Sequence, residues 1–159
     1  MTTRLALCLA ILVMVPSRFG FAAELPMVPD DALTPGVVAS SDPATVCAAK
    51  SYSKAHRATT AATKRAVYRS YGIAPAGRDF EIDHRLPLAL GGADAIANLW
   101  PQQGWTHPSY HDKDRLEQRL WIMVCKHRAM PLATAQQMLL GDWIQAYRQL
   151  FGQPLSGRI

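Results

Sequence analysis

Asp83, His84 and Asn98 are the residues of this 159-residue chain whose types and spacing could do chemistry. A neutral imidazole can take a proton from water near neutral pH, so His84 is a candidate general base. The carboxylate of Asp83 could bind a hard divalent cation, which would polarise a phosphate. Asn98 could orient the His84 ring through a hydrogen bond. Such a set suits hydrolysis of a phosphodiester bond. Neighbouring side chains of a strand point to opposite faces, so Asp83 and His84 need a bend or bulge to serve one site.

Two short extended segments joined by a glycine-rich loop are expected to position these residues. Apolar and polar residues alternate over 80–84, and the residues at 88–90 alternate in the same way. Residues 98–100 form a second short run that Pro101 is expected to end. The glycine pair within 91–94 predicts a turn.

Helical signals flank this region. Thr59 or Thr60 can cap a helix that runs to Tyr71, and Gly72 supplies its end. Lys64, Arg65 and Arg69 would form a basic side of this helix that could contact the phosphates of a nucleic acid.

Two more helical regions follow the extended segments. Ser109 and Asp112 have the spacing of a capping box, and an apolar stripe over 116–127 continues the helix that they begin. A last helical region covers 132–151, where Gly141 can break it in two. The predicted fold class is therefore α+β and mainly helical, with a short β-hairpin and helix packed against flanking helices.

The N-terminus has the pattern of a secretory signal peptide. A positively charged start precedes an apolar run at 5–15, which is too short to span a bilayer. Small residues allow cleavage after Ala22 or Ala23, so residues 1–23 are predicted to be removed. The alternative is an uncleaved membrane anchor. With cleavage, the protein is expected in the periplasm or the medium, with no membrane association.

The remaining chain has the length of one domain. Residues 24–43 are rich in proline and predict an extended lead-in, 44–152 form the domain, and 153–159 form a tail. The formal charge of +5 falls to +3 when Arg4 and Arg18 leave with the signal peptide. A charge this small does not by itself identify a nucleic-acid-binding protein.

Two cysteines, Cys47 and Cys125, remain after signal cleavage. An even number of cysteines in an exported protein predicts one disulfide. It would close a long loop around the Asp-His pair. The alternative is two separate buried thiols.

The wider pattern resembles the HNH (His-Me finger, ββα-metal) endonucleases, and in particular small exported bacterial members. The resemblance spans about 47–148. It implies a hairpin and helix that hold one divalent metal ion, a nucleic-acid substrate that is expected to be DNA, and a monomer. His84 would be the base, Asp83 a metal ligand and Asn98 the orienting residue. The resemblance rests on the segments Glu81–Gly92, Asn98–Gln102, Lys113–Glu117, Val124-Cys125 and Asp142-Trp143 with Tyr147.

The resemblance leaves the last metal ligand open between His107 and His111. His107 lies nine residues after Asn98, which is the usual family spacing. His111 lies in the first turn of the helix, where the positive helix end keeps an imidazole neutral, and it is the preferred choice. Mg²⁺ is the expected metal, with Mn²⁺, Ni²⁺ and Zn²⁺ as alternatives.

Two further basic residues are expected to act at the phosphate. Arg85 could contact the transition-state phosphate or the DNA backbone. Lys113, near the start of the helix, would attract phosphate. Two rival functions remain: a non-catalytic nucleic-acid-binding protein of the HNH fold, and a protein with a structural metal site.

Overall fold

The computed structural model describes residues 27–48, 52–74, 80–105 and 107–152. The predicted signal peptide and tail lie outside these ranges. Within them, no helix has the length and apolar character needed to cross a membrane. Two 3₁₀ turns (Leu88–Leu90 and Ile96–Asn98) and a π-helical turn (Ile122–Lys126) accompany the main elements. These elements are α1 (Pro43–Ala48), α2 (Tyr52–His56), α3 (Ala61–Ser70), β1 (Phe80–His84), β2 (Leu99–Gln103), α4 (Tyr110–Trp121), α5 (Leu132–Leu140) and α6 (Trp143–Phe151).

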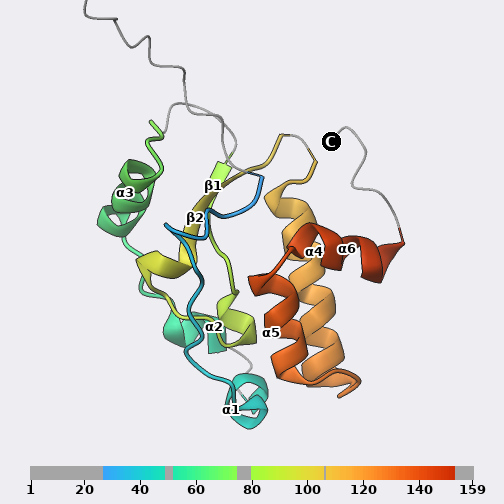
Figure 1. The fold of residues 1–159 in the computed structure, drawn as a ribbon. Coiled ribbons are helices and arrows are strands. Elements are labelled where there is room, and N and C mark those ends of the chain that lie inside the picture. Colours follow the sequence, from blue (N-terminus) through green and yellow to red (C-terminus); the bar gives the residue numbers. More distant parts are fainter. Residues whose placement is uncertain (1–26, 49–51, 75–79, 106, 153–159) are drawn as a thin grey trace, which may run out of the picture.

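The fold is α+β and mainly helical, as the sequence predicts, and β1 and β2 form one antiparallel hairpin (Figure 1). The register runs without interruption from Phe80 opposite Gln103 to His84 opposite Leu99. The expected bulge at Asp83 is therefore wrong. Alternation along a regular strand would separate the side chains of Asp83 and His84, yet both line one cavity, which is described below.

Two other details of the hairpin differ from expectation. β2 continues through Pro101 to Gln103, because both strands of a two-stranded sheet are edge strands, where proline is tolerated. Leu88–Leu90 form a 3₁₀ turn instead of an extended run, and Gly91 follows with a φ of 84°. Both end leucines are buried, so their apolar spacing reflects burial in a turn.

The hairpin lies between two groups of helices, with α3 on one side and α4 on the other (Figure 1). Ile82 and Leu99 pack with Val67 of α3 in a small apolar cluster. The opposite face carries Asp83, which meets Lys113 of α4. Asp83 therefore ties the hairpin to α4.

The predicted helix signals are confirmed. Thr60 caps α3, with its side chain accepting a hydrogen bond from the Thr63 amide. Ser109 and Asp112 form the capping box of α4. The last helical region divides into α5 and α6, and Asp142 caps α6. These caps fix where each helix begins relative to the hairpin.

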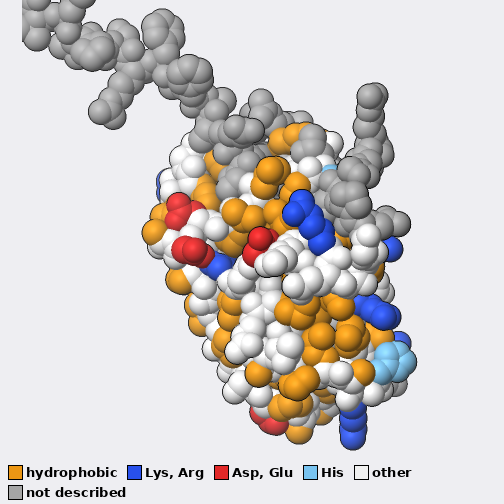
Figure 2. All heavy atoms as spheres, turned by 45° about the vertical axis from the view of Figure 1, so that its right-hand side comes forward, with side chains coloured by type: hydrophobic (Ala, Val, Ile, Leu, Met, Phe, Trp, Pro, Cys, Tyr) orange, Lys and Arg blue, Asp and Glu red, His pale blue; other side chains and the backbone are white. Residues whose placement is uncertain are grey.

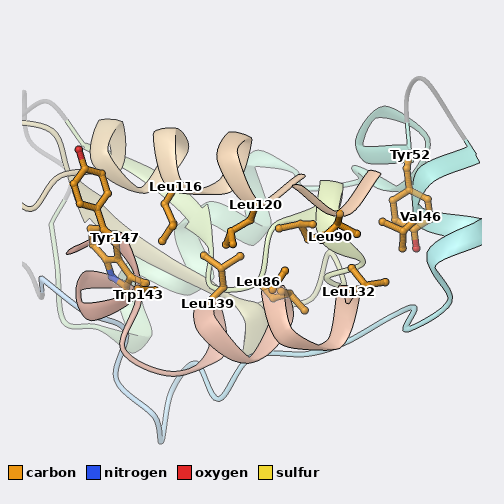
Figure 3. Packing of buried hydrophobic residues seen from close by; sticks show 13 residues of the cluster. Val46, Tyr52, Leu86, Leu90, Leu116, Leu120, Leu132, Leu139, Trp143 and Tyr147 are labelled. Atoms are coloured by element: carbon orange, nitrogen blue, oxygen red, sulfur yellow. The ribbon is translucent and has the colours of Figure 1, made fainter. Parts of the chain in front are cut away.

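The main core lies between α4 and the pair α5–α6, and Figure 3 shows its side chains interleaved. Leu116 and Leu120 of α4 face Leu139 of α5, and all three are fully buried. Leu86 and Leu90, from the loop that follows β1, enter the same core. The core therefore fixes the position of the segment that follows His84.

The disulfide between Cys47 and Cys125 is confirmed, and it joins α1 to the π-helical turn across 78 residues of sequence. Disulfides persist in oxidising compartments, which fits export of the chain. Residues 27–42, the described part of the predicted lead-in, contain no helix or strand apart from a single bridge between Val38 and Gly92. This segment is part of the fold, because Thr34 is fully buried and donates to the carbonyl of Leu99.

Candidate active site

His84 stands at the end of β1 and is buried, with 4% of its surface exposed. Its Nε2 atom lies 2.8 Å from Oδ1 of Asp94, which comes from the loop between the two strands. In the neutral tautomer that donates from Nε2 to this carboxylate, the lone pair lies on Nδ1. Asp94 thus holds the His84 ring in one orientation, with Nδ1 as its basic nitrogen.

Asp94 also fastens the connection between α2 and α3. Its carboxylate accepts hydrogen bonds from the Ala58 amide and from the Thr59 hydroxyl. Burial acts to raise the pKa of Asp94, but the hydrogen bonds from Thr59, Ala58 and His84 outweigh it and hold this pKa below its usual value. Sequence reasoning treated Asp94 only as a turn residue. A carboxylate ten residues after a candidate base, in a glycine-rich loop, was the available signal.

The pKa of His84 is lowered from its usual value. Burial of the ring is the main cause, and it outweighs the raising influence of the Asp94 hydrogen bond and of the Asp83 charge. The positive charge of Arg57 lowers this pKa further. His84 is therefore neutral near neutral pH, which a general base requires.

Asn98 does not orient the His84 ring, contrary to expectation. Its Nδ2 donates to the carbonyl oxygens of Leu86 (2.9 Å) and Ala93 (2.8 Å). Its Oδ1 accepts from the backbone amides of Val37 (3.3 Å) and Leu86 (3.0 Å). These four contacts use both hydrogens and both acceptor positions of the amide. Asn98 therefore shapes the loop that carries Asp94, and its effect on His84 is indirect.

Asp83 is tied to α4 by Lys113. The Nζ atom of Lys113 lies 2.6 Å from Oδ2 of Asp83 and 2.6 Å from the carbonyl oxygen of His84. It also donates to the carboxylate of Glu117 one turn further along α4. The three hydrogens of the ammonium are thereby used. The other oxygen of Asp83 accepts the backbone N–H of His84 at 2.7 Å.

The predicted contact of Lys113 with nucleic acid is wrong, because Lys113 is fully buried. Burial alone would lower the pKa of Lys113, but the carboxylates of Asp83 and Glu117 outweigh it, so this pKa is raised and the ammonium keeps its charge. Burial raises the pKa of the Glu117 carboxyl against the pull of Lys113. The cation therefore joins α4 to the end of β1.

Asp83 and His84 open into one cavity of about 390 Å³, called here the His84 cavity. Carboxylates dominate part of its wall. Burial and the charges of Asp83 and Asp114 raise the pKa of Glu81 to about 7, and burial and the charge of Asp83 also raise the pKa of Asp114. The charged residues of the wall are Arg57, Lys64, Glu81, Asp83, Asp114 and Glu117.

Neither candidate histidine ligand lines the His84 cavity. His107 lies 2.6 Å from the carboxylate of Asp112 and so supports the start of α4. His111 is exposed, and its ring lies against that of Tyr110 with centroids 4.1 Å apart. It lines a neighbouring pocket together with Asp114. Of the two, His111 is nearer in the fold to the carboxylates of the cavity.

Arg85 does not reach the cavity, so its predicted phosphate contact is wrong. It is buried and turned toward the N-terminal segment, where its Nη1 atom lies 2.5 Å from Oδ1 of Asp31 and 2.8 Å from the carbonyl oxygen of Thr34. It also donates to the carbonyl of Leu140 at the end of α5. Arg85 therefore fastens the segment at 27–42 to the helical core.

The three basic residues of α3 divide into two groups. Lys64 lines the His84 cavity. Arg65 and Arg69 are exposed and lie one turn apart, on the side of the helix away from buried Val67. On the face formed by α4 to α6, Lys and Arg side chains stand apart and form no continuous basic patch (Figure 2). The positive charge on the wall of the His84 cavity comes from Lys64 and Arg57.

Oxygen donors of the kind that Mg²⁺ prefers line the cavity. Asp83 and Asp114 share it with Glu81, whose pKa is raised first by burial and then by the negative charges of Asp83 and Asp114. Among the described residues, no three histidine, cysteine or acidic side chains already converge as a ligand set. The donor chemistry fits a divalent cation, and the structure presents candidate donors for it.

Comparisons of the chain with protein-family models, with curated proteins and with solved structures found no match.

Proposed function

We propose that this protein is an exported nuclease of the HNH type that hydrolyses phosphodiester bonds in nucleic acid, with His84 as the general base. The observation that carries the proposal is the buried His84–Asp94 pair at the end of a hairpin, with Nε2 and Oδ1 2.8 Å apart. The hairpin is followed by a helix whose acidic residues face the same cavity. This order of elements is the one that the HNH resemblance implies.

In the proposed reaction, Nδ1 of His84 takes a proton from water, and the resulting hydroxide attacks the phosphorus atom. The carboxylate of Asp94 stabilises the imidazolium that forms, because it accepts a hydrogen bond from Nε2–H and keeps its negative charge. Lys64 and Arg57, on the wall of the cavity, supply positive charge for the phosphate oxygens. As the new P–O bond forms, the bond between phosphorus and the leaving oxygen breaks on the opposite side of the phosphorus atom. The leaving oxygen takes a proton from solvent, and His84 returns its proton to solvent.

A divalent cation would be held by Asp83 and Asp114. When bound, it would polarise the scissile phosphate and stabilise the leaving oxygen. Lys113 keeps Asp83 fixed at the end of β1 through its 2.6 Å contact, so this carboxylate keeps one position relative to His84. The protein is proposed to act in the periplasm or the medium, where the disulfide persists.

A plasmid-nicking assay tests the proposal. The protein with Mg²⁺ is expected to convert supercoiled plasmid to open circles, and parallel reactions with Mn²⁺, Ni²⁺, Zn²⁺ and an RNA substrate define metal and substrate. His84→Ala is expected to lose activity by a factor on the order of 10² to 10⁴. His127→Ala, which changes an exposed histidine, is the matched control. Intact plasmid under every metal condition would leave a non-catalytic binding protein as the better interpretation.

A further inference from the structure

A second pocket, of about 640 Å³, lies beside the His84 cavity between α2 and α4. We call it the α2–α4 pocket. Its wall shares Ser53, Ala89, Asp114 and Glu117 with the wall of the His84 cavity. The two hollows are therefore neighbours, and a polymer held for cleavage at His84 has this pocket next to its scissile bond.

The two hollows differ in their chemistry. The His84 cavity has the cations Arg57 and Lys64 on its wall, which suit phosphate. The α2–α4 pocket also has one cation, Arg115, but it differs in its aromatic wall residues, which are the half-buried indole of Trp121 together with Tyr52 and His111. Flat rings of this kind are what nucleobases stack against.

Neutral polar groups accompany the aromatic wall. Gln118 is exposed on α4 and lines the pocket, and its amide both donates and accepts hydrogen bonds. Ser53 offers a hydroxyl from the facing helix. Lys126 places an ammonium 5.8 Å from the centre of the Trp121 ring, which adds positive charge beside the aromatic surface. These groups match the hydrogen-bonding edge and the flat face of a base attached to a polyanion.

We propose that the α2–α4 pocket binds one unpaired nucleobase of the substrate, next to the phosphate cleaved at His84, so that the enzyme prefers single-stranded nucleic acid. The inference rests on the proposed function for the position of the scissile phosphate. The pocket has the size of a small-molecule site and not of a duplex. A base inside a duplex reaches such a pocket only after it is unstacked and unpaired, which costs free energy.

Binding is measured first, by NMR titration of the wild-type protein in EDTA so that no turnover occurs. The probes are deoxyadenosine monophosphate and 2-deoxyribose 5-phosphate, which lacks the base. The nucleotide is expected to shift the resonances of the Trp121 indole and the Gln118 amide, and to bind at least about fivefold more tightly than the sugar phosphate. Equal affinities for the two probes would overturn the proposal that the pocket binds a nucleobase.

Matched variants locate the binding. Trp121→Ala is expected to weaken nucleotide binding by about tenfold, whereas Trp105→Ala, at an exposed indole outside the pocket, is expected to leave it unchanged. Gln118→Ala is expected to weaken binding and Gln149→Ala, on the exposed side of α6, is not. Since Gln118 is exposed, its replacement does not endanger folding. Nucleotide binding that is unaffected at both Trp121 and Gln118 contradicts the inference.

Cleavage is compared on single-stranded and duplex oligonucleotides of one sequence. The wild type is expected to cut the single strand at least about tenfold more efficiently in kcat/KM, and Trp121→Ala to reduce this ratio toward one. Equal cleavage of both substrates by the wild type would overturn the proposal that the pocket binds a nucleobase, but it would support the proposed nuclease activity. If neither substrate is cut, the proposed function fails, and the NMR titrations alone then decide whether the pocket binds a base.

Discussion

His84 and Asp94 form a buried imidazole–carboxylate pair in which Nε2 and Oδ1 are 2.8 Å apart, although neither the family resemblance nor the sequence pattern pointed to Asp94. The pair fixes both the orientation and the tautomer of the ring. Because Asp94 also holds Ala58 and Thr59, the same carboxylate positions the segment that carries Arg57.

Asp94→Asn is expected to reduce kcat by a factor on the order of 10² to 10⁴, since an amide can also donate to Nε2 and thereby favour the wrong tautomer. The measurement is the initial rate of nucleic-acid cleavage at saturating substrate. Asp42→Asn, at an exposed aspartate that caps α1, serves as the control and should keep the wild-type rate. A full rate in Asp94→Asn would show that the pair has no catalytic role.

The protonation of His84 can be followed directly by NMR of its ring in metal-free buffer. Its pKa is expected below the usual histidine value, because burial disfavours the imidazolium. Asp94→Asn should lower this pKa further, since the carboxylate stabilises the charged ring. Folding favours the neutral form, so the stability linked to His84 is lost as pH falls below the usual value and the unfolded chain binds the proton. A pKa raised by the Asp94→Asn change would contradict this balance.

Lys113→Met removes the buried ammonium and leaves the carboxylates of Asp83 and Glu117 without their counter-charge. The expected loss is about 3–5 kcal/mol in the free energy of unfolding, measured by urea denaturation. The loss should be smaller at about pH 4 than at about pH 8, because the carboxyls can then be protonated. Lys54→Met, at an exposed lysine of α2, is expected to change stability by no more than about 0.5 kcal/mol.

Arg85→Leu is expected to destabilise the fold by about 2–5 kcal/mol, since it removes the guanidinium that joins Asp31, Thr34 and Leu140. Thermal unfolding measures this change. Once the folded fraction is taken into account, kcat should remain that of the wild type. A large fall in kcat with unchanged stability would instead restore the role at the phosphate that the sequence suggested.

Lys64 and Arg65 provide a matched pair on one helix, since both are exposed and only Lys64 lines the His84 cavity. Lys64→Ala is expected to lower kcat/KM by about tenfold, because it removes a charge–phosphate contact. Arg65→Ala should lower it much less and mainly at low salt, where distant charges are least screened. Equal effects of the two variants would mean that the whole helix surface binds the substrate.

Local signals in the sequence predicted much of the fold. Thr60 and Ser109 marked the starts of α3 and α4, because a cap needs only residues within one turn. The alternation over 80–84 predicted β1. The cysteine count predicted the pairing of Cys47 with Cys125. Each of these signals lies either in a few neighbouring residues or in the number of cysteines.

The contacts that complete the site were harder to predict, because they join residues distant in sequence. A lysine such as Lys113 is expected at the surface when only its sequence is known. In the fold it is paired with Asp83, 30 residues earlier, and with Glu117. Arg85 looks like a phosphate ligand until Asp31 and the carbonyls of Thr34 and Leu140, all distant in sequence, bind its guanidinium. The bulge was wrong because Asp83 and His84 line one cavity from a strand of regular register.

The contacts of Gln136 in α5 bear on the order in which parts of the site form during folding. Its amide donates to the carbonyls of Ser40 and Leu90 at 2.9 Å each, and the first contact spans 96 residues. Contacts between such distant residues form late in folding, after the cost of closing the loop is met. The Gln136 contact therefore supports the start of the loop that carries Asp94 only after α5 has been synthesised and packed. If the proposed function holds, a nascent or still-unfolded chain lacks the assembled His84–Asp94 pair and would be inert toward the nucleic acid of the cell that makes it.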